Sequence, residues 1–92
     1  MQKNSLKSFP RVFTLPDCPN CSKLKEWLDT RKVKFEESLF DTEAQVDFIM
    51  RNVFGNPPIL DVGSKAMSSE DLFVDGMLDE EKAWEVLKSE KA

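Results

Sequence analysis

The chain has 92 residues and a mass of 10.6 kDa, a length that fits one domain with a modest core. It has two cysteines and no histidine, which argues against hydrolases of the Ser-His or Cys-His type and against a four-ligand zinc site within one chain. A formal net charge of −4 leaves no broad cationic surface for a phosphate backbone, so we expect no nucleic-acid partner. The apolar runs are too short for a membrane span and the N-terminal segment lacks a signal-peptide core, so we expect a cytoplasmic protein.

The charge is distributed unevenly along the chain. Residues 1–35 hold 8 Lys/Arg against 3 Asp/Glu, giving +5, whereas residues 36–92 hold 5 against 14, giving −9. Both cysteines lie in the basic part. This asymmetry is compatible with a role at the cysteines or with simple solvation.

The first half of the chain predicts two strands that alternate with two helices. A β-branched and aromatic run over 11–15 predicts a strand, which Pro16 stops. Pro19 then suits a first helical turn, and the three- or four-residue spacing of apolar side chains extends this helix to about Arg31. The alternation within 33–40 predicts a second strand, with Val33, Phe35 and Leu39 on one face. Thr42 and Gln45 form a capping-box pair that starts a helix over about 43–52.

The second half predicts a hairpin and a final helix. Pro58 leads directly into a third strand over 59–62, and a turn at 63–64 leads to a fourth strand near 65–68. A single helical turn is expected over 69–73, and a break in regular structure follows it at 75–76. Asp79 then caps a last helix. We therefore expect one α/β domain over residues 1–92 with a flexible tail at 1–9. Its order is β-α-β-α-β-β-α, with a four-stranded mixed sheet covered by helices on both faces.

Cys18 and Cys21 are the residues to which this pattern assigns chemistry. In a first helical turn, positions three apart face the same side about 5 to 6 Å from each other, which is close to the separation that a disulfide requires. Cys18 is expected at the helix N-terminus, where free N–H groups favour a thiolate, and Cys21 one turn inward, where burial keeps it protonated. Asp17 disfavours the thiolate whereas Lys23 and Lys25 favour it, so the sequence leaves the net effect open.

With these motifs the chain resembles the glutaredoxin-like proteins of the thioredoxin-fold superfamily. The resemblance covers about residues 11–88 and depends on the strand before C-P-N-C, the V-x-F-E-E stretch at 33–37, the proline before Ile59, and S-E-D-L at 69–72 followed by Gly76 and Leu78. It implies a three-layer thioredoxin-like fold and a monomeric dithiol oxidoreductase that reduces disulfides of proteins or small thiols through a mixed disulfide. No bound cofactor or metal is implied. Glutathione, another low-molecular-weight thiol or a thioredoxin-reductase-type flavoenzyme would restore the dithiol.

The resemblance also implies a substrate groove beside the dithiol. Its strand-opening proline is expected to be cis, with Pro58 preferred over Pro57. The candidates for binding a thiol substrate are the following: Pro19, Asn20, Ser69, Glu70 and Asp71. The chain departs from glutathione-using relatives, because Met67-Ser68 replaces the usual Gly-Gly, Asn56-Pro57 replaces Thr-Val, and Leu15 replaces a basic residue.

Three alternatives stay open at this point. The residues at 69–71 could only cap a turn. Cys18 could ligate an iron-sulfur cluster shared by two chains, with external thiols completing the ligands. The domain could also be a redox-inert thioredoxin-fold binding module.

Overall fold

The central sheet of the computed structural model, which describes residues 9–63 and 65–89, is mixed and four-stranded. Its strands are β2 (Arg11–Thr14), β3 (Glu36–Leu39), β4 (Ile59–Asp61) and β5 (Ala66–Met67), in the order β3-β2-β4-β5. β2 and β3 run parallel, whereas β4 is antiparallel to β2 and to β5. The predicted pair of β-α units and the closing hairpin are therefore confirmed. The tail expected at 1–9 lies outside the described residues except for Phe9.

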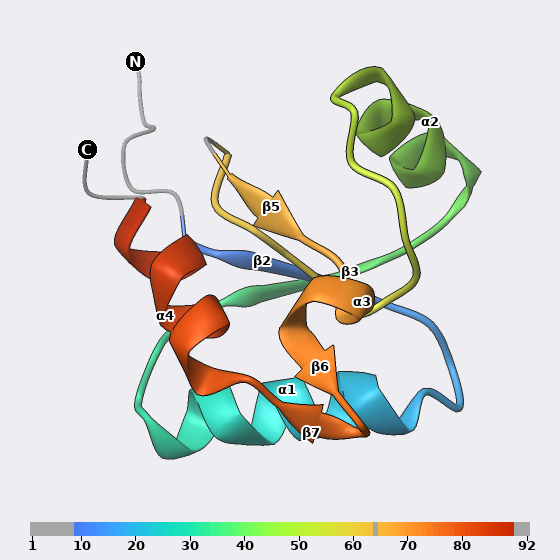
Figure 1. Ribbon diagram of the computed structural model, residues 1–92. Helices are drawn as coiled ribbons and strands as arrows, with labels where there is room; N and C mark the ends of the chain where they lie inside the picture. Colours follow the sequence, from blue (N-terminus) through green and yellow to red (C-terminus); the bar gives the residue numbers. More distant parts are fainter. Residues whose placement is uncertain (1–8, 64, 90–92) are drawn as a thin grey trace.

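Helices cover both faces of this sheet and give the expected three layers (Figure 1). α1 (Pro19–Thr30), α3 (Ser69–Leu72) and α4 (Glu80–Ser89) lie on one face, and α2 (Thr42–Met50) lies on the other. The strands alternate between the two layers, as a period of two requires. Val12 and Leu60 pack with α1, α3 and α4, whereas Phe13 and Ile59 pack against Phe48 of α2.

The start of α2 differs from the sequence prediction. Asp41, not Thr42, is the N-cap, and its carboxylate accepts a hydrogen bond of 2.9 Å from the backbone N–H of Ala44. An aspartate in extended conformation caps a helix as well as threonine does, so the helix begins one residue earlier. Gln45 donates instead to the carbonyl of Phe40 at 3.4 Å.

β3 is shorter than the predicted strand over 33–40. The N–H of Val33 bonds to the carbonyl of Leu28 at the end of α1, so this residue belongs to the helix exit. Val33 and Phe35 still pack on the core, as expected. Leu39 does not, because it is 56% exposed at the far end of the strand.

A small hairpin after α3 was not predicted. β6 (Phe73–Val74) pairs antiparallel with β7 (Met77–Leu78), and Asp75 and Gly76 between them both have positive φ, 53° and 79°. Two successive residues with positive φ are typical of the tight hairpin turn that Asp-Gly favours. Asp79 then caps α4 as predicted, accepting from the N–H of Glu81 at 3.1 Å. None of the helices in 9–63 and 65–89 has the length and apolar character to cross a membrane.

Candidate active site

The two cysteines form a disulfide at the N-terminus of α1. Their Cα atoms are 5.2 Å apart, as the spacing predicted. Cys18 is the N-cap residue in extended conformation, and Pro19 takes the first helical position. The Sγ of Cys18 accepts a hydrogen bond of 3.2 Å from the backbone N–H of Cys21. This N–H is one of the donors that a helix start leaves without an intrahelical partner, so it is available to a sulfur atom.

The two sulfur positions differ in access to solvent. Cys18 is half-buried beside exposed Pro19 and half-buried Asn20, whereas Cys21 is only 2% exposed and packs on the inner face of α1. An incoming disulfide can therefore reach Cys18 and not Cys21. The expected division between an accessible and a sheltered thiol is present in the geometry.

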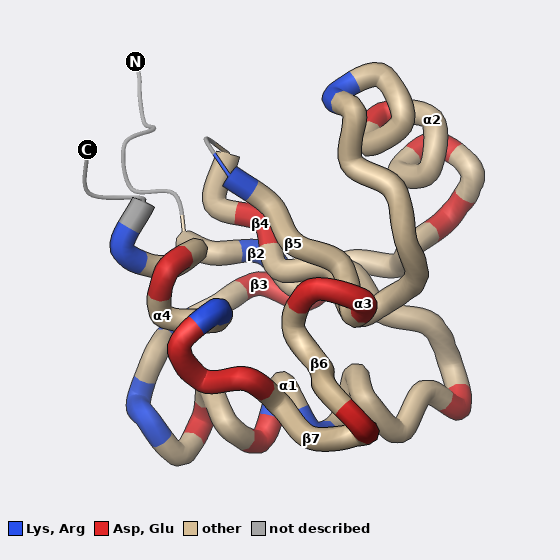
Figure 2. The backbone as a smooth tube through the Cα atoms, in the orientation of Figure 1, with Lys and Arg blue, Asp and Glu red and all other residues tan. Residues whose placement is uncertain are grey.

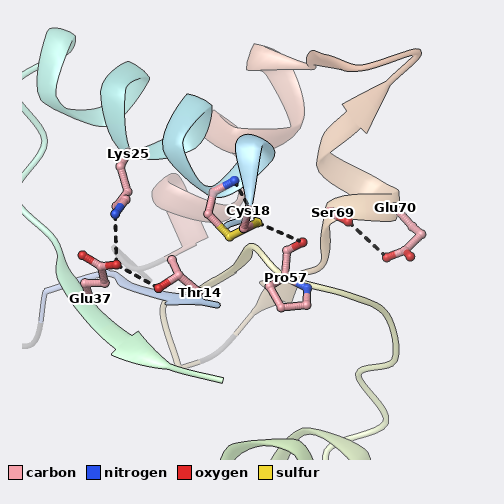
Figure 3. The surroundings of a disulfide bond; sticks show 8 residues. Thr14, Cys18, Lys25, Glu37, Pro57, Ser69 and Glu70 are labelled. Carbon is pink, nitrogen blue, oxygen red and sulfur yellow. Dashed lines mark hydrogen bonds and ion pairs between the residues drawn. A yellow bond between two sulfur atoms is a disulfide. The ribbon is translucent and has the colours of Figure 1, made fainter. Parts of the chain in front are cut away.

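A proline loop lies against the dithiol from the opposite side (Figure 3). The bond between Pro57 and Pro58 is cis, and Pro58 is buried at the start of β4. The carbonyl oxygen of Pro57 is 4.0 Å from the Sγ of Cys18. Since proline has no N–H, Pro57 offers a bound substrate an acceptor but no donor.

Glu70 holds this loop in place. Its carboxylate accepts hydrogen bonds from the backbone N–H of Asn56 at 2.9 Å and from the Asn56 side-chain amide at 2.7 Å. The backbone hydrogen bond from Asn56 is the largest cause that holds the pKa of Glu70 below its ordinary value. The N–H of Ser69 donates to the carbonyl of Asn56 at 3.0 Å. Gly55 precedes the loop with a φ of 139°, and a Cβ there would come within 2.6 Å of the Glu70 carboxylate.

A groove of about 770 Å³ opens on the other side of Cys18. Within it, Glu37 of β3 accepts hydrogen bonds through one oxygen from the Lys25 ammonium at 3.0 Å and the Thr14 hydroxyl at 2.8 Å. Lys25 first, and Thr14 second, lower the pKa of Glu37 from its ordinary value. This cluster joins α1, β3 and β2 beside the dithiol (Figure 3).

Comparisons with known proteins agree with this geometry. The family model described as glutaredoxin matches residues 11–57, just over half of the chain, including both cysteines. The chain belongs to the glutaredoxin family. The crystal structure of a mutant of the thioredoxin-like protein BC3987 is similar, with a TM-score of 0.62 at 22% identity over 85% of this chain and 97% of that one. No curated protein sequence matches the chain.

Membership in the glutaredoxin family and a dithiol at disulfide distance fit a thiol-disulfide oxidoreductase. Glutaredoxins use no prosthetic cofactor. In the part of the chain that the structure describes, no group of three or more Cys, Asp or Glu side chains is placed to hold a metal ion.

The residues predicted to bind a thiol substrate divide into two sets in this glutaredoxin-family site. Pro19 and Asn20 lie beside Cys18 on the first turn of α1. Ser69 and Glu70 lie on α3 and hydrogen-bond to Asn56, and Asp71 is an exposed residue of the same short helix. The contacts of Ser69 and Glu70 position the proline loop.

Two sets of contacts in this site were not predicted from the sequence. Lys23 donates to the carbonyl of Gly76 at 2.8 Å and Lys25 is paired with Glu37, so both ammonium groups near the start of α1 have hydrogen-bond partners. The Glu37 cluster was missed, although Glu37 interrupts the apolar alternation over 33–40.

Proposed function

We propose that this glutaredoxin-family protein is a dithiol oxidoreductase that reduces disulfides through Cys18 and Cys21. The observation that carries the proposal is the disulfide itself, with its accessible sulfur at the start of a helix and beside the Pro57 carbonyl. The hydrogen bond from the backbone N–H of Cys21 to the Cys18 sulfur supports a role for this N–H in stabilising a Cys18 thiolate after reduction.

The reaction begins when the Cys18 thiolate attacks one sulfur of a substrate disulfide. A Cys18–substrate disulfide forms, the substrate S–S bond breaks, and the leaving thiolate takes a proton from solvent. Cys21 then loses its proton and attacks the Cys18 sulfur. The second substrate thiol departs, the Cys18–Cys21 disulfide forms, and two electrons have passed from the protein to the substrate.

A low-molecular-weight thiol such as glutathione, or a thioredoxin-reductase-type flavoenzyme, would return these two electrons. With glutathione, two thiols are oxidised to one disulfide as the Cys18–Cys21 bond is reduced. The candidate substrates are disulfide-containing proteins and small mixed disulfides.

Reduction of insulin and of a small mixed disulfide by the wild-type protein tests this function. In separate assays, electrons come from glutathione with its reductase or from NADPH with a thioredoxin reductase, and turnover shows which class of donor the protein accepts. Cys18→Ser is expected to abolish turnover. Cys21→Ser is expected to retain the first step and to accumulate a mixed disulfide at Cys18 visible by mass spectrometry. Full activity of Cys18→Ser would refute the proposal.

A further inference from the structure

The groove beside Cys18 has apolar walls near its mouth. Leu15 and Leu39 line it and are 42% and 56% exposed, and Pro16 and Pro19 line it as well. One of these exposed leucines is on the loop between β2 and α1, and the other is on β3. Together they offer a contact surface, beside the reactive sulfur, for an apolar side chain next to a substrate cysteine.

The charged residues of this groove are two acids and one base. Asp17, Glu37 and Lys25 are the charged side chains among the described residues that line it. The one cation, Lys25, is paired with Glu37 at 3.0 Å, and the same carboxylate oxygen also accepts from the buried Thr14. The groove therefore has an excess of one negative charge, and its ammonium group is already bound to a carboxylate.

A carboxylate on a substrate would find unfavourable surroundings here. It would have to compete with Glu37 for Lys25 while facing Asp17, and like charges a few ångströms apart repel even in partly solvated sites. An uncharged flank would meet the leucines and leave the ion pair intact. A substrate with a carboxylate and a substrate with an uncharged flank thus differ in their charge beside the cysteine and not in their sulfur chemistry.

We propose that Glu37 is a specificity-determining residue, which makes the groove prefer disulfides whose cysteine has an apolar, uncharged flank over those with a carboxylate at that position. This inference rests on the proposed oxidoreductase function and names its substrate class as a peptide or protein disulfide of that kind.

The test uses two mixed-disulfide peptides that have the same sequence, with an apolar residue after the cysteine, and that end in either a carboxylate or an amide. Wild-type protein is expected to reduce the amide peptide with the higher kcat/KM. Glu37→Gln removes one negative charge and frees Lys25, so the preference for the amide should fall about threefold to tenfold. Adding Lys25→Met to Glu37→Gln restores the net charge of the groove and should restore the wild-type preference.

Glu36→Gln is the matched control. Glu36 is on the same strand and loses the same charge when substituted, but it pairs with Arg11 at 3.8 Å and does not line the groove. The preference of Glu36→Gln for the amide peptide should stay at the wild-type value. Circular dichroism should show that all variants are folded. The inference is overturned if wild type does not distinguish the peptides, if Glu37→Gln leaves the ratio unchanged, or if Glu36→Gln shifts it equally. The proposed function would be refuted instead if Cys18→Ser reduced both peptides as well as the wild type does, or if the wild-type protein reduced neither peptide.

Discussion

Glu70 is the residue through which the stability of the proline loop can be measured. Its carboxylate receives two hydrogen bonds from Asn56, and the loop that Asn56 begins carries the Pro57 carbonyl beside Cys18. Glu70→Ala leaves the backbone N–H of Asn56 without this partner. Glu70→Gln keeps one acceptor but brings an amide donor toward the Asn56 amide.

The expected loss follows from the number of hydrogen bonds. Charge-assisted hydrogen bonds contribute about 1.5–3 kcal/mol each when sheltered, and the exposure of this site reduces the total for the pair to about 1.5–2 kcal/mol for Glu70→Ala. For a domain of this size that corresponds to a fall in Tm of about 6–16 °C. Urea unfolding at pH 7, followed by tryptophan fluorescence, measures the change in the free energy of unfolding.

The pH dependence gives an independent check. Because the pKa of Glu70 is lowered in the folded protein from the ordinary value of 4.5, its stabilising contribution is present above pH 4.5. It is lost as the pH falls through the folded pKa, so the stability difference between wild type and Glu70→Gln should shrink below pH 4.5. Asp71→Asn, at the adjacent exposed position, is the control. An equal loss in Asp71→Asn, or a difference that does not change with pH, would refute this role of Glu70.

Three further substitutions test other parts of the structure. Gly55→Ala should lower the free energy of unfolding by about 1–3 kcal/mol, because its Cβ would clash at a φ of 139°, whereas Gly63→Ala, with open space around its Cβ, should cost less in the same urea titration. Phe48→Ala should cost about 3–5 kcal/mol since Phe48 is 1% exposed, and the exposed Ile49→Ala should stay within about 0.5 kcal/mol; equal effects would contradict the assignment of the second core. Asp17→Asn should favour the Cys18 thiolate and speed its alkylation by iodoacetamide at pH 6.5 about twofold, whereas an unchanged rate would show that the neighbouring carboxylate has no influence on Cys18.

The parts of the fold that follow from local rules could be predicted from the sequence. Pro19 and the apolar spacing after it place α1 within a residue of its observed end, and the same spacing places Cys21 on the buried face. Asp79 caps α4 as expected because the N-cap preference depends only on neighbouring residues. The β6–β7 hairpin was missed because strands of two residues are too short to show alternation, although Asp75-Gly76 is itself a hairpin motif.

The parts of the site that depend on three elements at once could not be predicted. Thr14, Lys25 and Glu37 are separated by 11 and 12 residues, and only the packing of α1 over β2 and β3 brings them together. The capping of α2 was wrong for a simpler reason, because adjacent Asp41 and Thr42 are both good caps and the sequence does not choose between them.

The charge at the dithiol shows why a linear count of charges misleads. Both cysteines lie in the basic first 35 residues, which would suggest a site suited to anions. The parallel pairing of β3 with β2 aligns Glu37 with Val12 and turns its side chain toward α1, where it neutralises Lys25. Figure 2 shows acidic positions on β3, on α3 and at the β6–β7 turn. The pairing of strands, rather than the local sequence, therefore determines the charge that a substrate meets beside Cys18, which is why Glu37→Gln should change substrate preference more than its neighbour Glu36→Gln does.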